Sequence, residues 1–119
     1  MSLMHELSIM ESVMDTVRKS ADELNIHHIE KIKLVIGKMT MALPESLQFA
    51  FQALARDELF SGAVLEIEER NIRCRCSGCQ NEFAIESAYR FVCPGCGSRE
   101  VGMIQGNELY IDSYEGDED

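Results

Sequence analysis

Two Cys-x-x-Cys pairs constrain this chain more than any other feature of its sequence. Cys76 and Cys79 form the first pair, Cys93 and Cys96 form the second, and thirteen residues lie between the pairs. This spacing is typical of a structural zinc site, in which two tight turns each supply two thiolates to a tetrahedral ion at about 2.3 Å. Both pairs enclose a glycine and the second also encloses a proline, as such turns require.

Two disulfides or a redox Cys-x-x-Cys motif are the alternatives to zinc. No secretory segment is visible, five cysteines leave one over, and no βαβ pattern surrounds either pair, so zinc is favoured. Four thiolates fill the coordination sphere, and the ion would therefore hold structure without performing hydrolysis. Cys74 is the remaining cysteine, and we interpret it as a strand residue in preference to a spare ligand or a reactive thiol.

The net charge of the chain indicates which kinds of partner it can bind. Counting 11 Lys and Arg against 21 Asp and Glu gives a net charge of −10, which disfavours nucleic acid and anionic membranes and suits cations or basic partners. No apolar run approaches the roughly 18 residues of a membrane span, and the chain does not start with a basic and then apolar segment. We therefore expect a cytoplasmic protein in a reducing environment.

Hydrophobic periodicity predicts two helices. The first covers about residues 5–24 and ends near Asn25, and its apolar residues recur at spacings of three and four: Leu7, Met10, Met14, Val17, Ala21 and Leu24, widened by Ile9 and Val13. Pro44 favours the first turn of the second helix, whose apolar face would be Leu47, Ala50, Phe51, Leu54 and Ala55.

Alternating apolar residues predict three strands, over residues 29–39, about 63–72 and 108–113. In the first strand Ile32, Leu34 and Ile36 would face the core and Val35 the opposite side. Gly37 would end or bulge this strand.

These elements predict an α+β fold in which two helices pack on a small mixed sheet, because each helix has one apolar stripe and the strands alternate. The last strand needs partners. If it returns to the first sheet, the four-cysteine module is a zinc-ribbon-like insertion between two strands. We expect an α/β domain over residues 4–70 plus 105–115, a zinc-binding module over 71–104, and a solvated, mobile acidic tail over 115–119.

The start of the chain offers a second metal site. Residues 1–3 precede a second methionine and are expected to be a cloning remnant, so that the natural chain begins at Met4. Its α-amine, the His5 imidazole and the intervening amide nitrogens could then wrap a metal in fused chelate rings, which suits Ni²⁺ or Cu²⁺ better than Zn²⁺. Spacing alone favours the simpler interpretation, in which His5 and Glu6 decorate a helix start and Glu6 complements the helix dipole.

Other candidate side chains give no catalytic site. His27 and His28 follow the first helix and are interpreted as loop surface. The chain has no histidine after residue 28, no predicted open metal position and no recognisable pairing of a nucleophile with a base, so we expect that it is not an enzyme.

Taken together, the residues resemble the HypA/HybF family of hydrogenase-maturation nickel metallochaperones. The resemblance covers essentially the whole chain from residue 4, and it rests on four segments: Met4-His5-Glu6-Leu7-Ser8, residues 69–79 (ERNIRCRCSGC), Cys93-Pro94-Gly95-Cys96 and Leu109-Tyr110-Ile111.

The resemblance implies a nickel-binding α/β domain with a zinc domain inserted before the final strand. It also implies that the protein binds Ni²⁺ at the chain N-terminus and delivers it during maturation of [NiFe]-hydrogenase. The nickel site would comprise His5, backbone nitrogens beginning at Met4, and Glu6 as the adjacent acidic residue. The structural zinc ligands would be Cys76, Cys79, Cys93 and Cys96, and Cys74 would match a position outside that set.

The implied partners are a nickel-delivery GTPase and the hydrogenase large subunit, with urease accessory proteins as further partners in some organisms. A homodimer is compatible with the sequence.

The competing hypothesis is a zinc-ribbon module that binds nucleic acid or takes part in transcription. Residues 70–100 carry five arginines against three glutamates, but a Zn(Cys)₄ centre with a formal charge of −2 would cancel that excess. The aromatic residues available for base stacking are only Phe83, Tyr89 and Phe91. We therefore expect no nucleic-acid partner.

Overall fold

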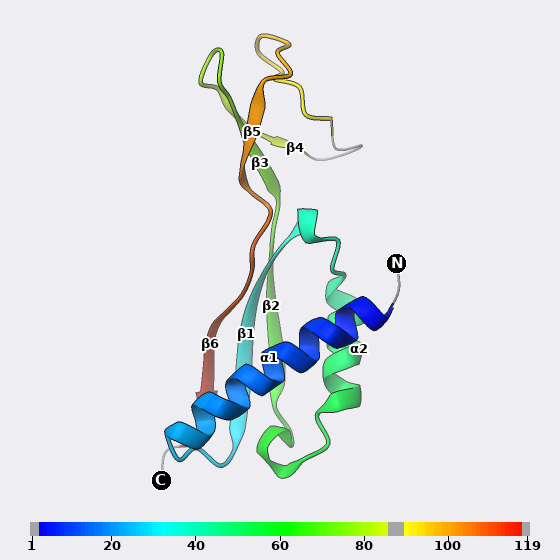
Figure 1. The fold of residues 1–119 in the computed structure, drawn as a ribbon, viewed down its shortest axis with the longest axis vertical. Helices are drawn as coiled ribbons and strands as arrows, with labels where there is room; N and C mark the ends of the chain where they lie inside the picture. The colour runs from blue at the N-terminus through cyan, green and yellow to red at the C-terminus, as the bar shows by residue number, and fades with distance from the viewer. Residues whose placement is uncertain (1–2, 86–89, 118–119) are drawn as a thin grey trace. The chain divides into compact units, whose positions relative to one another are not determined.

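The computed structural model describes residues 3–85 and 90–117, and it confirms the predicted α+β class (Figure 1). The chain forms these elements in order: α1 (Leu3–Glu23), β1 (Ile29–Gly37), the 3₁₀ turn η1 (Lys38–Thr40), α2 (Pro44–Leu54), the 3₁₀ turn η2 (Glu58–Phe60), β2 (Val64–Arg70), β3 (Ile72–Cys76), β4 (Glu82–Ile85), β5 (Val101–Gln105) and β6 (Leu109–Gly116). Most of the suggested cloning remnant (residues 1–2), Tyr89 and the last two residues of the acidic tail lie outside the described residues.

The strands form two three-stranded sheets, one in the order β2-β1-β6 and the other in the order β4-β3-β5. The last strand, β6, thus returns to β1 as predicted, and the four-cysteine module is inserted before it. The chain divides into two compact units, one made of Met1–Val35, Ala42–Glu68 and Tyr110–Asp119, the other of Ile36–Met41 and Glu69–Leu109.

In the first unit, α1 crosses the sheet and packs against α2 (Figure 1). The predicted stripe of α1 is buried at Met10, Val13, Met14, Val17 and Ala21. The prediction for Leu24 is wrong, since its side chain is 64% exposed. The physical reason is that the helix ends at Glu23, so Leu24 lies past the regular stripe, and Asn25 takes the left-handed conformation typical of a helix end, with φ of 58°.

The central strand β1 is buried on both sides over Leu34, Val35 and Ile36. Val35, on the side opposite Leu34 and Ile36, is also buried, so both faces of the strand are covered at this point. The Lys31 and Lys33 side chains, nearer the start of the strand, reach solvent and pair with carboxylates of β2.

The end of β6 departs from the predicted solvated tail. The strand continues to Gly116, and Asp117 is held to the loop before β1: its backbone N–H donates to the His28 carbonyl at 3.0 Å, and its carboxylate accepts the backbone N–H groups of His27 and His28. Residues 115–117 are thus part of the folded unit. Among the described residues, no helix is long and apolar enough to cross a membrane.

The second unit contains the strands β3, β4 and β5, all antiparallel. The predicted single strand over residues 63–72 is divided at Asn71 into β2 and β3. Cys74 lies in β3 with its side chain fully buried, which confirms that it is a strand residue. The core of this unit is small and consists of Ile72, Cys74, Cys76, Phe83, Ile85 and Cys93.

Candidate metal centre

The four predicted zinc ligands converge at one end of the second unit. Their sulfur atoms all lie within 4.8 Å of one another, with 3.6 Å between Cys76 and Cys96 and 3.5 Å between Cys79 and Cys93. Sulfur atoms at about 2.3 Å from a tetrahedral ion are about 3.8 Å apart, so these thiols are spaced to share one zinc ion. In the ranges 3–85 and 90–117, no other group of three or more potential ligands is as closely gathered.

The two cysteine turns have the same backbone design. In the first, the N–H of Gln80 donates to the carbonyl of Cys76 at 2.9 Å, and in the second, the N–H of Gly97 donates to the carbonyl of Cys93 at 2.8 Å. Gln80 and Gly97 both have a left-handed backbone, with φ of 64° and 76°. The N–H of the first cysteine in each turn donates at 2.9 Å to the carbonyl five residues later, that of Asn81 or Ser98. Each turn therefore fixes its two sulfurs by local bonds.

The same turns favour the thiolate form of the first cysteine in each pair. The pKa of Cys76 is lowered, and that of Cys93 is lowered to about 6, chiefly because the N–H of the second cysteine in each pair hydrogen-bonds to the sulfur. The N–H of Ser98 acts to lower the pKa of Cys96, but the neighbouring sulfurs outweigh it and raise that pKa to about 12. A metal ion must therefore displace protons from part of the cluster, which makes binding dependent on pH.

The proposed nickel residues lie in the first turn of α1, in the other unit. The His5 side chain is 50% exposed, whereas that of Glu6 is 1% exposed, and His5 Nδ1 lies 3.4 Å from Glu6 Oε1. Among the described residues, this Oε1 atom has no hydrogen-bond partner. The structure thus places an exposed imidazole beside a buried carboxylate, one oxygen of which has no hydrogen-bond partner.

The burial of Glu6 was not predicted, although the sequence contains its signal. Glu6 stands four residues before Met10 and eleven before Val17, so it lies on the buried stripe of α1. A carboxylate at such a position costs free energy unless a donor or cation compensates it. The side chain of Met4 lies outside the description, and the structure does not test its role.

The remaining histidines have structural contacts. His27 is exposed, as predicted, but His28 is half-buried. Its Nε2 lies 2.6 Å from the carbonyl oxygen of Ser61, which can only accept a hydrogen bond, so this nitrogen carries the proton. His28 therefore lies in the loop after α1, as predicted, and its ring also connects this loop to the turn that contains Ser61.

Comparison with known proteins assigns the family. The sequence profile described as "HypA: Hydrogenase/urease nickel incorporation, metallochaperone, hypA" matches residues 4–116. The hydrogenase maturation factor HypA of Moorella thermoacetica is 44% identical over 114 residues, covering 96% of this chain and 100% of that protein. HypA of Chlorobium luteolum is 40% identical over 116 residues, covering 98% of each chain.

Solved structures agree with this result. A structure titled "Solution structure of HypA protein" is similar with a TM-score of 0.69 and 27% identity, covering 95% of this chain and 96% of that one. The chain therefore belongs to the HypA family of nickel-incorporation metallochaperones.

Proposed function

We propose that this protein binds Ni²⁺ through the start of α1 and delivers it during maturation of [NiFe]-hydrogenase, and that its four-cysteine cluster holds a structural zinc ion. The observation that carries the nickel site is the half-exposed imidazole of His5 beside the buried carboxylate of Glu6, whose Oε1 atom has no hydrogen-bond partner. A bound cation would compensate the negative charge of this buried group.

The backbone supports the same site. The first four N–H groups of an α-helix have no acceptor within the helix, and in α1, which begins at Leu3, these include the amide of His5. Amide, amine and imidazole nitrogens together form the nitrogen-rich ligand set that suits Ni²⁺. Glu6 Oε1 lies on the Nδ1 side of the His5 ring, so the role we propose for Glu6 is to supply negative charge beside the bound cation.

The zinc assignment is supported by the donor set and by the size of the second unit. Four thiols at tetrahedral spacing suit zinc, which would supply a cross-link between the turn after β3 and the turn before β5. The hydrophobic core of this unit is too small to fold reliably without a staple. Because four thiolates leave no open coordination position, we assign the zinc no catalytic role and the protein no enzymatic activity.

The family supports a place among hydrogenase maturation proteins. We propose a nickel-delivery GTPase and the hydrogenase large subunit as partners in the cytoplasm, urease accessory proteins as further clients, and a nickel-binding domain (4–70 plus 105–115) distinct from a zinc domain (71–104). The nucleic-acid alternative loses support from two of its three stacking residues, because Phe83 is buried and the partly buried Phe91 packs against the same core.

The test is a calorimetric nickel titration, with parallel absorption spectra, of zinc-loaded protein beginning at Met4. We expect stoichiometric binding that is lost in His5→Ala, weakened in Glu6→Gln and retained in His27→Ala, because only the first two changes alter the proposed site. Binding that survives His5→Ala unchanged would contradict the proposal.

A second titration tests the α-amine. Protein beginning at Met1 should bind nickel more weakly or with a different spectrum than protein beginning at Met4, while its zinc content stays the same. Equal affinity and equal spectra for the two chains would remove the amine from the proposed ligand set.

A further inference from the structure

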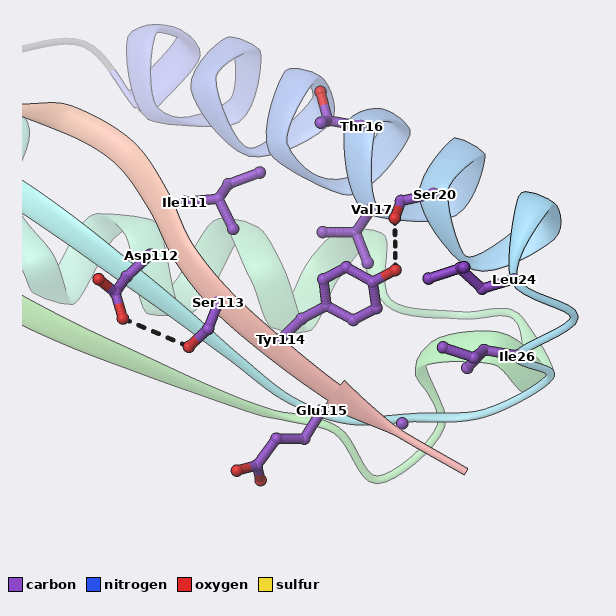
Figure 2. Close-up of a pocket in the computed structure, with 11 residues that line it drawn as sticks. Thr16, Val17, Ser20, Leu24, Ile26, Ile111, Asp112, Ser113, Tyr114 and Glu115 are labelled. Atoms are coloured by element: carbon purple, nitrogen blue, oxygen red, sulfur yellow. Dashed lines mark hydrogen bonds between the residues drawn. The ribbon is translucent and has the colours of Figure 1, made fainter. Parts of the chain in front are cut away.

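A groove in the first unit is not used by the proposed function. It lies between the C-terminal half of α1 and the strand β6, and its volume is about 670 Å³ (Figure 2). The residues that line it are Thr16, Val17, Ser20, Leu24, Ile26 and residues 111–116.

The groove is lined by both apolar and polar side chains. Figure 2 shows Ile111 and Tyr114 directed from β6 toward α1, and the Tyr114 hydroxyl hydrogen-bonds to that of Ser20. These two β6 residues are three positions apart, so the ordinary alternation of the strand is interrupted between them and both contribute to the groove. At the end of the groove, Leu24 leaves 64% of its side chain exposed.

The strand beside this groove has an open edge. Among the described strands, β6 is the last in the order β2-β1-β6, and its only sheet neighbour is β1. An edge strand presents unpaired N–H and C=O groups to which another extended chain can bond. An open edge beside a groove that can accept alternate side chains is the arrangement by which domains bind peptides through strand addition.

We propose that β6 binds an extended segment of a partner protein as a fourth strand of this sheet, with apolar side chains of that segment in the groove and Lys or Arg side chains between them. Charge supports a basic partner. The described lining residues include Asp112 and Glu115 but no Lys or Arg, and the whole chain carries a net charge of −10.

The same charges argue against a second copy of this chain as the occupant. Residues 109–116 contain two carboxylates and no cation, so two β6 strands side by side would bring like charges together across the new edge. Like charges in facing strands are destabilising.

The probe is a fluorescein-labelled synthetic peptide in which lysine and valine alternate, and its binding to the full chain is followed by fluorescence anisotropy at about 0.15 M salt. Leu24→Gln should weaken binding about tenfold, because it removes an apolar contact of the groove. Leu43→Gln, at a similarly exposed leucine before α2, should leave it unchanged.

The charge contribution is tested with a matched pair of double variants. Asp112→Asn with Glu115→Gln should weaken binding, whereas Glu45→Gln with Glu58→Gln changes the net charge equally at exposed sites outside the groove and should have little effect. Equal weakening by both pairs would mean general attraction to an acidic protein and would overturn the proposal.

Strand addition is tested on the peptide backbone. An added strand bonds through the backbone groups of alternate residues only. Of two peptides, one N-methylated at every lysine and the other at every valine, one should bind as before and the other should not. Equal binding of both would refute strand addition. A dimer in sedimentation that is dispersed by Leu24→Gln would assign the groove to a second copy and would also overturn the proposal.

Discussion

The left-handed residue in each cysteine turn gives a prediction with a known magnitude. Gln80 and Gly97 occupy equivalent places, with φ of 64° and 76°. A side chain with a Cβ atom costs about 1 to 2 kcal/mol in this conformation, and glycine avoids that cost. A Cβ placed on Gly97 meets no atom within 4 Å, so Gly97→Ala changes the backbone energy without creating a clash.

We therefore expect Gly97→Ala to destabilise the zinc-bound turn by about 1 kcal/mol, after part of the conformational cost is offset by the lower entropy of the unfolded alanine chain. Because folding of such a module and zinc binding are linked, this loss should weaken zinc affinity about fivefold. At position 80 the natural residue is not glycine, so the test introduces one. Gln80→Gly should bind zinc about fivefold more tightly than Gln80→Ala, because alanine keeps a Cβ atom in the left-handed conformation and glycine does not.

At position 80 glycine is compared with alanine, and not with the natural glutamine, so that the loss of a side-chain hydrogen bond affects both variants equally. The Gln80 side chain donates a hydrogen bond to the carbonyl of Ser77 at 3.1 Å, and both substitutions lose it. Zinc affinity is measured by competition with a chromophoric chelator under reducing conditions. The reasoning is refuted if glycine and alanine give the same affinity at both positions, or if the preference for glycine appears at only one of the two turns.

Three further predictions concern the second unit. Gly106→Ala should lower the free energy of unfolding, measured in urea, by more than about 2 kcal/mol, because φ is 125° and the new Cβ would lie 2.9 Å from the Ile72 backbone. The control is Gly102→Ala, where a Cβ meets no atom within 4 Å. An equal loss of stability in both variants would contradict the argument. Removal of zinc by a chelator should abolish the dispersion of the amide NMR signals of residues 72–76 and 82–85, while the signals of α1 stay dispersed. Loss of dispersion in α1 as well would mean that the two units unfold together. Cys74→Ala should keep one zinc per chain by metal analysis at a cost of about 1 kcal/mol, since Cys74 lies outside the sulfur cluster, and loss of zinc would contradict that placement.

The long amphipathic segments were the parts of the fold that the sequence predicted well. The stripe of α1, the Pro44 start of α2 and the return of β6 to the first sheet all follow from periodicity and from the need to bury one apolar face. Predictions failed at positions where neighbours decide burial. Val35 is buried although it lies opposite the predicted core face of β1, and Leu24 is exposed because it lies past the end of α1 at Glu23.

The short strands β3, β4 and β5 were not predicted individually, because they are five residues or fewer and their pairing is set by contacts far apart in the chain. The close approach of Gly37 and Gly106 is likewise set by contacts between residues far apart in the chain. A Cβ on Gly37 would lie 2.1 Å from the Gly106 carbonyl oxygen, a contact that local sequence cannot reveal.

The sequence by itself identified the four cysteines that the structure brings together, because the chemistry of four thiols and the spacing of two tight turns are local properties of the chain. The sequence also identified the family, since the segments that resemble it can be compared without knowledge of the fold. The tertiary structure alone decided that the Glu6 carboxylate is buried beside His5 and that β6 is an open edge beside a groove. The physical reason is that burial and edge exposure depend on which segments pack together, and local sequence does not specify those long-range contacts.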